Sequence, residues 1–358
     1  MKKLTLTMAL LLLASLLPVR AADASGVCGE ALTWTLAEGT LTLSGQGSMD
    51  WYDMGAAPWY PYREEIRSLV VEEGVTALSY CAFFYLTELR SASLPASLVS
   101  IGDMGFYSCS ALPELELPSG VLELGEDVFY GCRGMSAVRV DGANPRYRDD
   151  DGVLFCGAEL VFYPPARPGT RYEIPAGTEK VGVCAFSYSQ LEEVRIPSSV
   201  YSFHFTALSD CYALRSVETE GWYYTARDGV LFSGSMKTLI CYPARKTGGE
   251  YRVPASVETV VNRAFAWNPW LQRVEFPGSL SEMGSLAFVG CTALRRVVFY
   301  GDAPSALGYR PLMPEAKLFY LPEKAGWQEA DTEEWDAGTL AAWTKETNLL
   351  APRGRLTQ

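Results

Sequence analysis

Apolar residues recur at a fixed interval along this chain. Leu89, Leu112 and Met135 open three successive units of equal length. Each unit begins Leu-x-x-Leu-x-Leu or a close variant, and alternation with period two is typical of a short β-strand with one buried face. One such coil cannot bury its own apolar edge. We therefore predict that consecutive coils stack and that their strands form one parallel sheet, about 4.8 Å apart.

Three further positions repeat within the unit. A proline follows many strands, where its missing N–H ends the strand ladder. A glycine then allows a tight corner, and a phenylalanine fills the wide side of the coil. The prolines are Pro95, Pro118, Pro197 and Pro277; the glycines are Gly102, Gly125, Gly182 and Gly284; the phenylalanines are Phe106, Phe129, Phe186, Phe265 and Phe288.

Another repeat position accepts cysteine, serine or asparagine: Cys109, Cys132, Ser189, Cys211, Asn268 and Cys291. We interpret it as a buried corner where a small polar group meets backbone N–H groups, which favours free thiols over disulfides there. Five cysteines lie outside this column and could pair, in a connectivity that the spacing leaves open: Cys28, Cys81, Cys156, Cys184 and Cys241.

Two strand-to-strand intervals are longer than the others, from Val140 to Ile174 and from Thr219 to Val253. Both contain Asp-Gly-Val-Leu-Phe, at residues 151–155 and 228–232, followed by an apolar strand that ends in Tyr-Pro. This pattern predicts a β-hairpin inserted into the coil near residues 141–170 and 220–250. Equivalent residues of the two blocks keep one constant spacing, as Pro164 and Pro243 do, which indicates an internal duplication.

The two ends of the chain depart from the repeat, which we expect to occupy residues 66–300. An open solenoid end exposes its core, so terminal units must be atypical. Residues 28–65 read as a β-rich N-terminal cap, with a hairpin around Glu38-Gly39. Residues 301–358 read as a C-terminal capping segment, including residues 318–322 and Trp327, Trp335 and Trp343.

The N-terminus has the pattern of a secretory signal peptide. Lys2 and Lys3 precede an apolar stretch over residues 8–17, followed by small residues that allow cleavage after Ala21 or after Ala24. The apolar stretch is shorter than the roughly 20 residues that cross a bilayer. We therefore expect a secreted protein without a membrane span, either free or loosely associated with the cell surface.

Composition agrees with a well-packed exported protein. Hydrophobic residues make up 48% of the chain and charged residues 20%, which suits a buried core and disfavours long disordered regions. The formal net charge of −12 repels nucleic acid and anionic membranes at long range. Neither is an expected partner.

Taken together, these motifs resemble the BspA-type leucine-rich-repeat proteins of bacterial surfaces. The resemblance rests on Leu-Pro or Ile-Pro after the strands, Ile101-Gly102 with Phe106 and Cys109, both Asp-Gly-Val-Leu-Phe inserts, and Cys28-Gly29 near the start. It implies a right-handed leucine-rich-repeat solenoid with an irregular convex side. It further implies an exported protein associated with adhesion to host or matrix proteins and to other cells.

Candidate chemistry is sparse. His204 is the only histidine, and it stands where other repeats carry the corner glycine, so we interpret it as structural. The chain lacks Cys-x-x-Cys pairs and phosphate-binding glycine loops. Asp149, Asp150 and Asp151 fit a solvated turn better than a calcium loop. We therefore expect no catalytic residue, no cofactor and no metal.

The outward-facing residues of the strands carry alternating charges. The central position of each strand is occupied in turn by Val70, Ser93, Glu116, Arg139, Glu173, Arg195, Glu218, Arg252, Glu275 and Val298. In a register that pairs equivalent positions, Glu116 lies beside Arg139 and Arg195 beside Glu218. Such pairs contribute a fraction of a kcal/mol each. One interpretation is that these pairs set the register of the sheet and keep its surface soluble. The alternative is that they form a charged strip that binds a ligand.

The leading functional hypothesis is a non-enzymatic module that binds extracellular protein or glycan ligands. Interface anchors are enriched in tyrosine and tryptophan, and the candidate contact residues are Tyr147, Trp222, Tyr223, Trp270, Arg139, Arg195, Glu116 and Glu218. The alternatives are an extracellular hydrolase that uses a pair of carboxylates, and a passive structural spacer.

Overall fold

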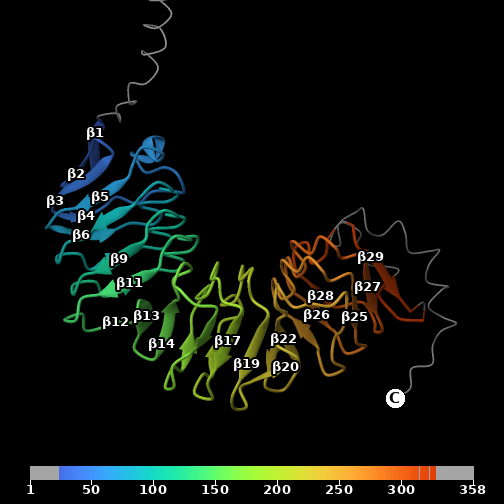
Figure 1. Cartoon of the computed structure of the whole chain (residues 1–358). Coiled ribbons are helices and arrows are strands. Elements are labelled where there is room, and N and C mark those ends of the chain that lie inside the picture. Colours follow the sequence, from blue (N-terminus) through green and yellow to red (C-terminus); the bar gives the residue numbers. More distant parts are fainter. Residues whose placement is uncertain (1–23, 314, 322, 328–358) are drawn as a thin grey trace, which may run out of the picture.

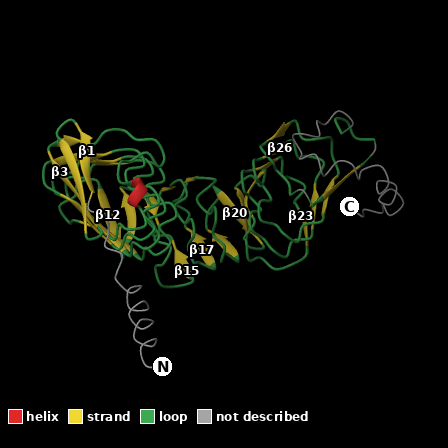
Figure 2. Cartoon of the chain, turned by 90° about the horizontal axis from the view of Figure 1, so that it is seen from above, coloured by secondary structure: helices red, strands yellow, loops and turns green. Residues whose placement is uncertain are grey.

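The computed structural model describes residues 24–313, 315–321 and 323–327. Short strands joined by turns form coils that stack along an arc (Figure 1). The strands of the central coils lie toward the outside of this arc and their turns toward the inside. Within the described residues the only helical segment is the 3-10 helix η1, Tyr60–Tyr62 (Figure 2). The leucine-rich-repeat solenoid class is confirmed.

The N-terminal cap is an antiparallel sheet of β1 (Ala24–Gly29), β2 (Leu32–Ala37) and β3 (Thr40–Gly45). Glu38 and Gly39 join β2 to β3 with φ of 52° and 77°, the conformation of a two-residue hairpin turn that matches strand twist. β3 then pairs in parallel with β5 (Ser68–Val71), so the cap covers the first coil edge to edge. Of the predicted signal peptide, residues 1–23 lie outside the described residues.

The strands predicted from Leu-x-x-Leu-x-Leu form the first series. It runs in three blocks. The first holds β5, β7 (Ser91–Ser93), β9 (Glu114–Leu117) and β11 (Ala137–Val140); the second holds β15 (Arg171–Glu173), β17 (Glu193–Ile196) and β19 (Ser216–Thr219); the third holds β23 (Glu250–Arg252), β25 (Arg273–Phe276), β27 (Arg296–Phe299) and β29 (Lys317–Tyr320). Within the first block, the strand ladder is interrupted between β7 and β9. Equivalent residues of successive coils face each other, as Leu115 and Val138 do.

The expectation of one parallel sheet is too simple, because each coil also supplies a strand to a second series. The blocks of this series are β4 (Gly47–Ser48), β6 (Val75–Leu78), β8 (Ser100–Ile101) and β10 (Glu123–Leu124); then β14 (Glu159–Phe162), β16 (Lys180–Val181) and β18 (Ser202–Phe203); then β22 (Thr238–Cys241), β24 (Thr259–Val260), β26 (Glu282–Met283) and β28 (Ala306–Leu307). Most of these strands have two residues. Such a segment is too short to produce a visible alternation.

The repeated glycines serve close approach between coils. A Cβ at Gly102 would lie 2.8 Å from the backbone N of Tyr80, and one at Gly125 would lie 2.3 Å from that of Asp103. Neither glycine has a left-handed φ. The interpretation of these positions as conformationally demanding corners was therefore wrong, since steric contact with the preceding coil selects glycine.

Each insert is larger than the predicted hairpin. β12 (Tyr147–Asp150), β13 (Val153–Cys156) and β14 form an antiparallel meander, and β20 (Tyr224–Arg227), β21 (Val230–Ser233) and β22 form a second one. The third strand of each meander continues the second series. The inserts also separate the blocks, because β11 has no strand partnership with β15, nor β19 with β23.

The phenylalanine column lies in the core as predicted, but the core is divided into three clusters instead of one continuous interior. The rings of Phe106 and Phe129 stack with centroids 6.2 Å apart, and those of Phe265 and Phe288 with centroids 4.6 Å apart. At the first insert Phe162 and Tyr163 extend the column, with Phe162 5.2 Å from Phe129. All of these side chains are buried. The register derived from the repeat is therefore confirmed.

The side chains of the cysteine column donate to carbonyl groups, and only Asn268 is shown accepting the expected backbone N–H groups. The thiol of Cys132 donates to the Phe106 oxygen at 3.0 Å, and that of Cys291 donates to the Phe265 oxygen at 2.9 Å. Asn268 donates to the Pro243 oxygen and also accepts from Leu271 N. All nine cysteines are free. A thiol suits this corner because the neighbouring carbonyl needs a donor and the space is small.

The described part of the C-terminal segment closes the core with an indole. The Trp327 ring lies 4.9 Å from Phe299 and 5.3 Å from Tyr320, and its Nε1 donates to the Gly301 oxygen at 3.0 Å. Trp335 and Trp343, also expected to contribute, lie outside the described residues.

Phe129→Ala is expected to lower the free energy of unfolding by about 3–5 kcal/mol, because it leaves a cavity between Phe106 and Phe162 in the middle of the column. Thermal and urea denaturation measure the loss. Val99→Ala, which truncates an exposed side chain, is the matched control. A Phe129→Ala protein as stable as that control would contradict the stacked core.

The stability of the protein is expected to fall as pH rises above 9. Burial raises the pKa of Cys291 and of Cys241 from 9.0 to about 12. Between these values the unfolded chain releases protons that the folded chain keeps, so the free energy of unfolding decreases. Urea denaturation between pH 8 and pH 10.5 measures the slope. Cys291→Ala should make it shallower, and an unchanged slope would contradict the assignment.

Candidate ligand-binding surface

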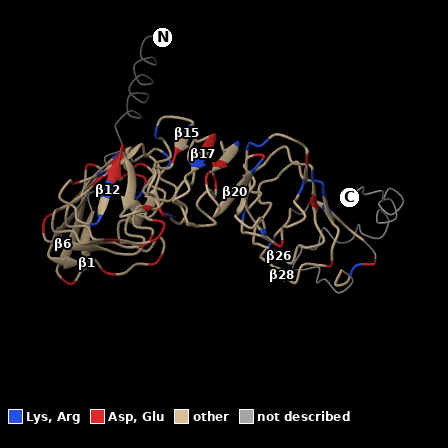
Figure 3. Ribbon diagram, turned by 90° about the horizontal axis from the view of Figure 1, so that it is seen from below, with Lys and Arg blue, Asp and Glu red and all other residues tan. Residues whose placement is uncertain are grey.

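Acidic and basic residues follow one another along β15 and β17 of the middle block (Figure 3). The Arg195 guanidinium lies 3.9 Å from a Glu173 oxygen, 3.6 Å from Glu218 and 2.5 Å from Glu220. Glu173, Arg195 and Glu218 occupy one register position on adjacent strands, as the repeat predicted. We call Glu173, Arg195, Glu218 and Glu220 the charge cluster.

The other predicted charge pair has a different partner. Arg139 faces Glu116 in the register of β9 and β11, but its guanidinium pairs with Asp149 at 3.4 Å. Asp149 also accepts from Val140 N at 2.9 Å and from Gly152 N at 3.1 Å. Arg139 and Asp149 therefore hold the first insert against β11. Glu116 is exposed, and Arg139 serves the insert more than a binding strip.

Three exposed aromatic residues lie directly beyond the charge cluster. Trp222 is 80% exposed, Tyr223 is 49% exposed, and their rings are 6.2 Å apart. Tyr223 also lies 6.2 Å from Tyr201, which belongs to the preceding coil and is 45% exposed. We call Tyr201, Trp222 and Tyr223 the aromatic patch. Glu220, two residues before Trp222, connects it to Arg195 of the charge cluster.

The patch rests on a fixed support. The hydroxyl of Tyr224, the first residue of β20, accepts a hydrogen bond from Phe203 N at 2.7 Å and donates to the Tyr201 oxygen at 3.3 Å. The second insert is thus fastened to the coil that carries Tyr201. A rigid support lowers the entropy lost when exposed side chains bind a ligand.

Tyr147 is not an exposed contact residue, contrary to prediction. It is buried, and its hydroxyl accepts from Leu124 N at 3.0 Å. Tyr147 is the first-insert equivalent of Tyr224 and fastens β12 to β10 in the same manner. Both tyrosines precede an Asp-Gly turn by the same number of residues, so an alignment of the two inserts could have predicted that they share one role. Trp270 is 39% exposed but stands apart from the patch, 5.3 Å from the Arg245 guanidinium.

Tyr201 is the member of the patch that the sequence analysis missed. It follows the inward-facing Val200, just as Val99 follows Leu98 and Leu122 follows Val121. All three of these following residues are exposed, at 45%, 42% and 38%. The repeat position alone could therefore have placed the Tyr201 ring on the surface.

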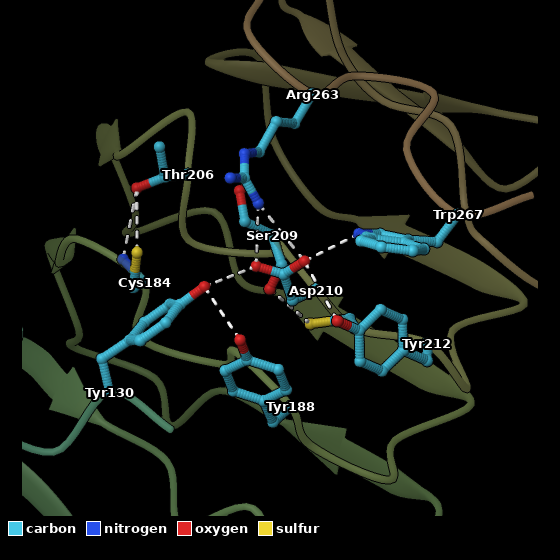
Figure 4. A network of polar contacts seen from close by, with 10 residues as sticks. Tyr130, Cys184, Tyr188, Thr206, Ser209, Asp210, Tyr212, Arg263 and Trp267 are labelled. Atoms are coloured by element: carbon cyan, nitrogen blue, oxygen red, sulfur yellow. Dashed lines mark hydrogen bonds and ion pairs between the residues drawn. The ribbon is translucent and has the colours of Figure 1, made fainter. Parts of the chain in front are cut away.

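A polar network around Asp210 joins the three blocks on their turn side (Figure 4). Asp210 is buried, and its carboxylate accepts from the Tyr130 hydroxyl at 2.7 Å and from Trp267 Nε1 at 2.7 Å. The Arg263 guanidinium lies 3.1 Å from the same carboxylate. Tyr130 belongs to the first block, Asp210 to the second, and Arg263 and Trp267 to the third. The network therefore spans both inserts.

The repeat positions the network. Tyr188, Asp210 and Trp267 share one repeat position, and all three have left-handed φ, at 65°, 58° and 66°. The Tyr188 hydroxyl donates to that of Tyr130 at 3.0 Å. Burial, with Tyr188 and Asp210 nearby, raises the pKa of Tyr130, so this phenol stays protonated as a donor. The side chains of this network bond one another, which indicates a structural role.

His204 lies near a thiol but does not activate it. Its Nδ1 is 2.8 Å from the Thr206 hydroxyl, and that hydroxyl lies 3.6 Å from Cys184 Sγ. Thr206 thus separates the imidazole from the sulfur, whereas a general base must contact its nucleophile. Burial raises the pKa of Cys184 to about 11, which keeps the thiol protonated. Over the described residues no group of three or more metal-ligating side chains is found.

A family model of the BspA-type leucine-rich-repeat region matches residues 60–144, 166–243 and 248–305, in six copies. The matched residues make up well over half of the chain. This chain belongs to the BspA-type leucine-rich-repeat family. Among curated proteins, none matches this BspA-type chain. In the part of the chain that the structure describes, we find no helix that could cross a membrane.

Solved structures agree with the fold of this BspA-type protein. A leucine-rich cell surface protein from Faecalibacterium prausnitzii A2-165 is similar, with a TM-score of 0.51 and 18% identity over 89% of this chain and 98% of that one. The pneumococcal vaccine antigen PcpA has a TM-score of 0.50 and 14% identity over 85% of this chain and 94% of its own. At these identities the likeness establishes the solenoid architecture.

Asp210→Asn is expected to destabilise the BspA-type solenoid by on the order of 3 kcal/mol. Asparagine keeps the shape and tolerates the left-handed φ, but the Arg263 guanidinium loses its counter-charge and three other donors lose a charged acceptor. Thermal denaturation measures the loss, and amide exchange should accelerate at both inserts. Asp53→Asn, at an exposed site, is the control. Equal melting of both variants would contradict a bracing role.

Proposed function

We propose that this chain is an exported, non-enzymatic protein that binds extracellular protein or glycan ligands, in an adhesion role. The observation that carries the proposal is the aromatic patch, because Trp222 is 80% exposed in a protein that buries most of its large apolar side chains. Exposed apolar patches rimmed by polar residues mark interaction sites. Membership of the BspA-type family supports a binding role as well.

The surroundings of the patch suit ligand binding. Its rings supply large, rigid contact area, and tyrosine and tryptophan dominate the energy of many interfaces. The adjoining charge cluster contains three carboxylates and Arg195, and Arg171 also pairs with its Glu218 at 3.5 Å, so carboxylates outnumber guanidinium groups. This excess of negative charge favours ligands with a basic or hydroxyl-rich rim next to an apolar centre.

Export rests on the predicted signal peptide of residues 1–21 or 1–24. The name of the Faecalibacterium neighbour, a cell surface protein, supports the same location. Over the described residues no comparable observation favours the carboxylate hydrolase or the passive spacer.

Binding of the purified chain to arrays of immobilised matrix proteins and glycans tests the proposal. The double variant Trp222→Ala/Tyr223→Ala is expected to bind the captured ligand at least tenfold more weakly, a loss of about 1.4 kcal/mol or more. Trp270→Ala, an aromatic truncation outside the patch, should bind as the unmodified chain does. The proposal fails if no ligand is captured, or if the double variant and the control bind equally well.

A further inference from the structure

The third block of the first series begins with a strand that is paired on one edge only. β23 is the terminal strand of its sheet and pairs only with β25. Val253 N donates to the Glu275 oxygen at 2.9 Å, and the Gly249 oxygen accepts from Gln272 N at 2.8 Å. Residues 249, 251 and 253 thus direct their backbone groups toward β25. Because directions alternate along a strand, the N–H and C=O of Glu250 and Arg252 point away from it.

The second insert leaves this edge open. The carbonyl of Gly229, in the turn between β20 and β21, accepts from Val217 N at 2.9 Å, so the turn is fixed to β19. A groove of about 560 Å³ runs from this turn past the C-terminal ends of β23 and β25. Its walls include Arg227 and Asp228 from the insert, Arg252 and Pro254 at the end of β23, and Pro277 and Tyr300 from the two following coils.

At the first insert, Arg167 spans the equivalent space beside β15. The Arg167 guanidinium lies 5.6 Å from the Tyr172 ring of β15 and pairs with Asp151 of the insert turn at 2.6 Å. Arg167 thereby bridges the space between the turn and β15. In the second block of the duplication this position is Lys246, which donates to the backbone oxygen of Asp228. An ammonium group is compact and does not cover an aromatic ring as a planar guanidinium does.

The groove is close to neutral. Arg252 pairs with Glu275 at 2.8 Å, and Arg227 and Asp228 carry opposite charges. Aromatic, proline and aliphatic side chains form most of the remaining wall. This surface therefore combines unused backbone donors and acceptors with apolar side walls, which is the requirement for adding an extra strand to a sheet.

We propose that the β23 edge binds an extended, predominantly apolar segment of another protein, of about five residues, as an additional strand of the third block. The bound segment hydrogen-bonds the N–H and C=O groups of Glu250 and Arg252, and its side chains nearest Pro254 contact the groove. This site is separate from the aromatic patch, so it stands even if the patch binds nothing.

The test selects heptapeptides from a random phage-displayed library on the immobilised chain and measures the best synthetic peptide by calorimetry. Arg252→Pro removes the N–H that faces the groove and should weaken binding at least tenfold. Arg252→Ala keeps that N–H and should change binding less than threefold. Glu173→Pro, the same change at the equivalent position of β15, should leave affinity and a stoichiometry of one unchanged.

Methylation of the peptide nitrogens provides a readout that leaves the protein intact. Strand pairing requires binding to be lost at alternate peptide positions and kept at those between them. The proposal is overturned if no peptide is selected, if methylation acts without this alternation, or if Arg252→Pro and Arg252→Ala bind equally. If the chain dimerises and Arg252→Pro abolishes the dimer, the edge binds a second copy of the chain, which also overturns the proposal. The Arg252→Pro variant is also tested on the ligand arrays. If it still captures the array ligands, a failure of peptide binding at β23 does not affect the proposed function of the aromatic patch.

Discussion

The contact between equivalent residues of consecutive coils determines this structure. The repeat period brings Phe106 onto Phe129 and Phe265 onto Phe288, and the same stacking places Cys132 under the Phe106 carbonyl and Arg139 opposite Glu116. Because a coil buries its apolar edge only against its neighbours, each contact stabilises two coils at once. The same stacking arranges the surface. Where neighbouring repeats carry a charged or aromatic residue at the same outward position, these side chains lie next to each other.

The two inserts interrupt this order, and single side chains restore it. The tyrosine hydroxyls of Tyr147 and Tyr224 each accept one backbone N–H where a strand would otherwise pair, and the turn carbonyls of Gly152 and Gly229 accept another. On the turn side, the Asp210 carboxylate collects donors from all three blocks. The two proposed binding sites lie next to these contacts. The aromatic patch includes residues just before the second insert, and the β23 edge follows that insert.

The sequence predicted whatever depends on the repeat. The strands of the first series, the phenylalanine column, the free cysteines of the repeat column and the register of Arg195 with Glu218 all follow from counting positions. The errors concern contacts between coils. Burial of Tyr147 depends on the Leu124 N–H of another strand, and the need for glycine at position 125 depends on the Asp103 backbone. Asp210 gathers Tyr130 and Trp267 from distant coils on either side of it, a meeting that arises from three-dimensional stacking.

The discontinuity of the strand ladders determines how this molecule responds to force. Within the second and third blocks, tension along the solenoid axis is shared by backbone hydrogen bonds in two series. At the first insert both series are interrupted, and the load passes to isolated contacts, among them the Tyr147 hydroxyl, the Gly152 carbonyl and the Asp210 network. Extension under flow or traction is therefore expected to begin where the ladders are interrupted. A chain built this way lengthens in steps.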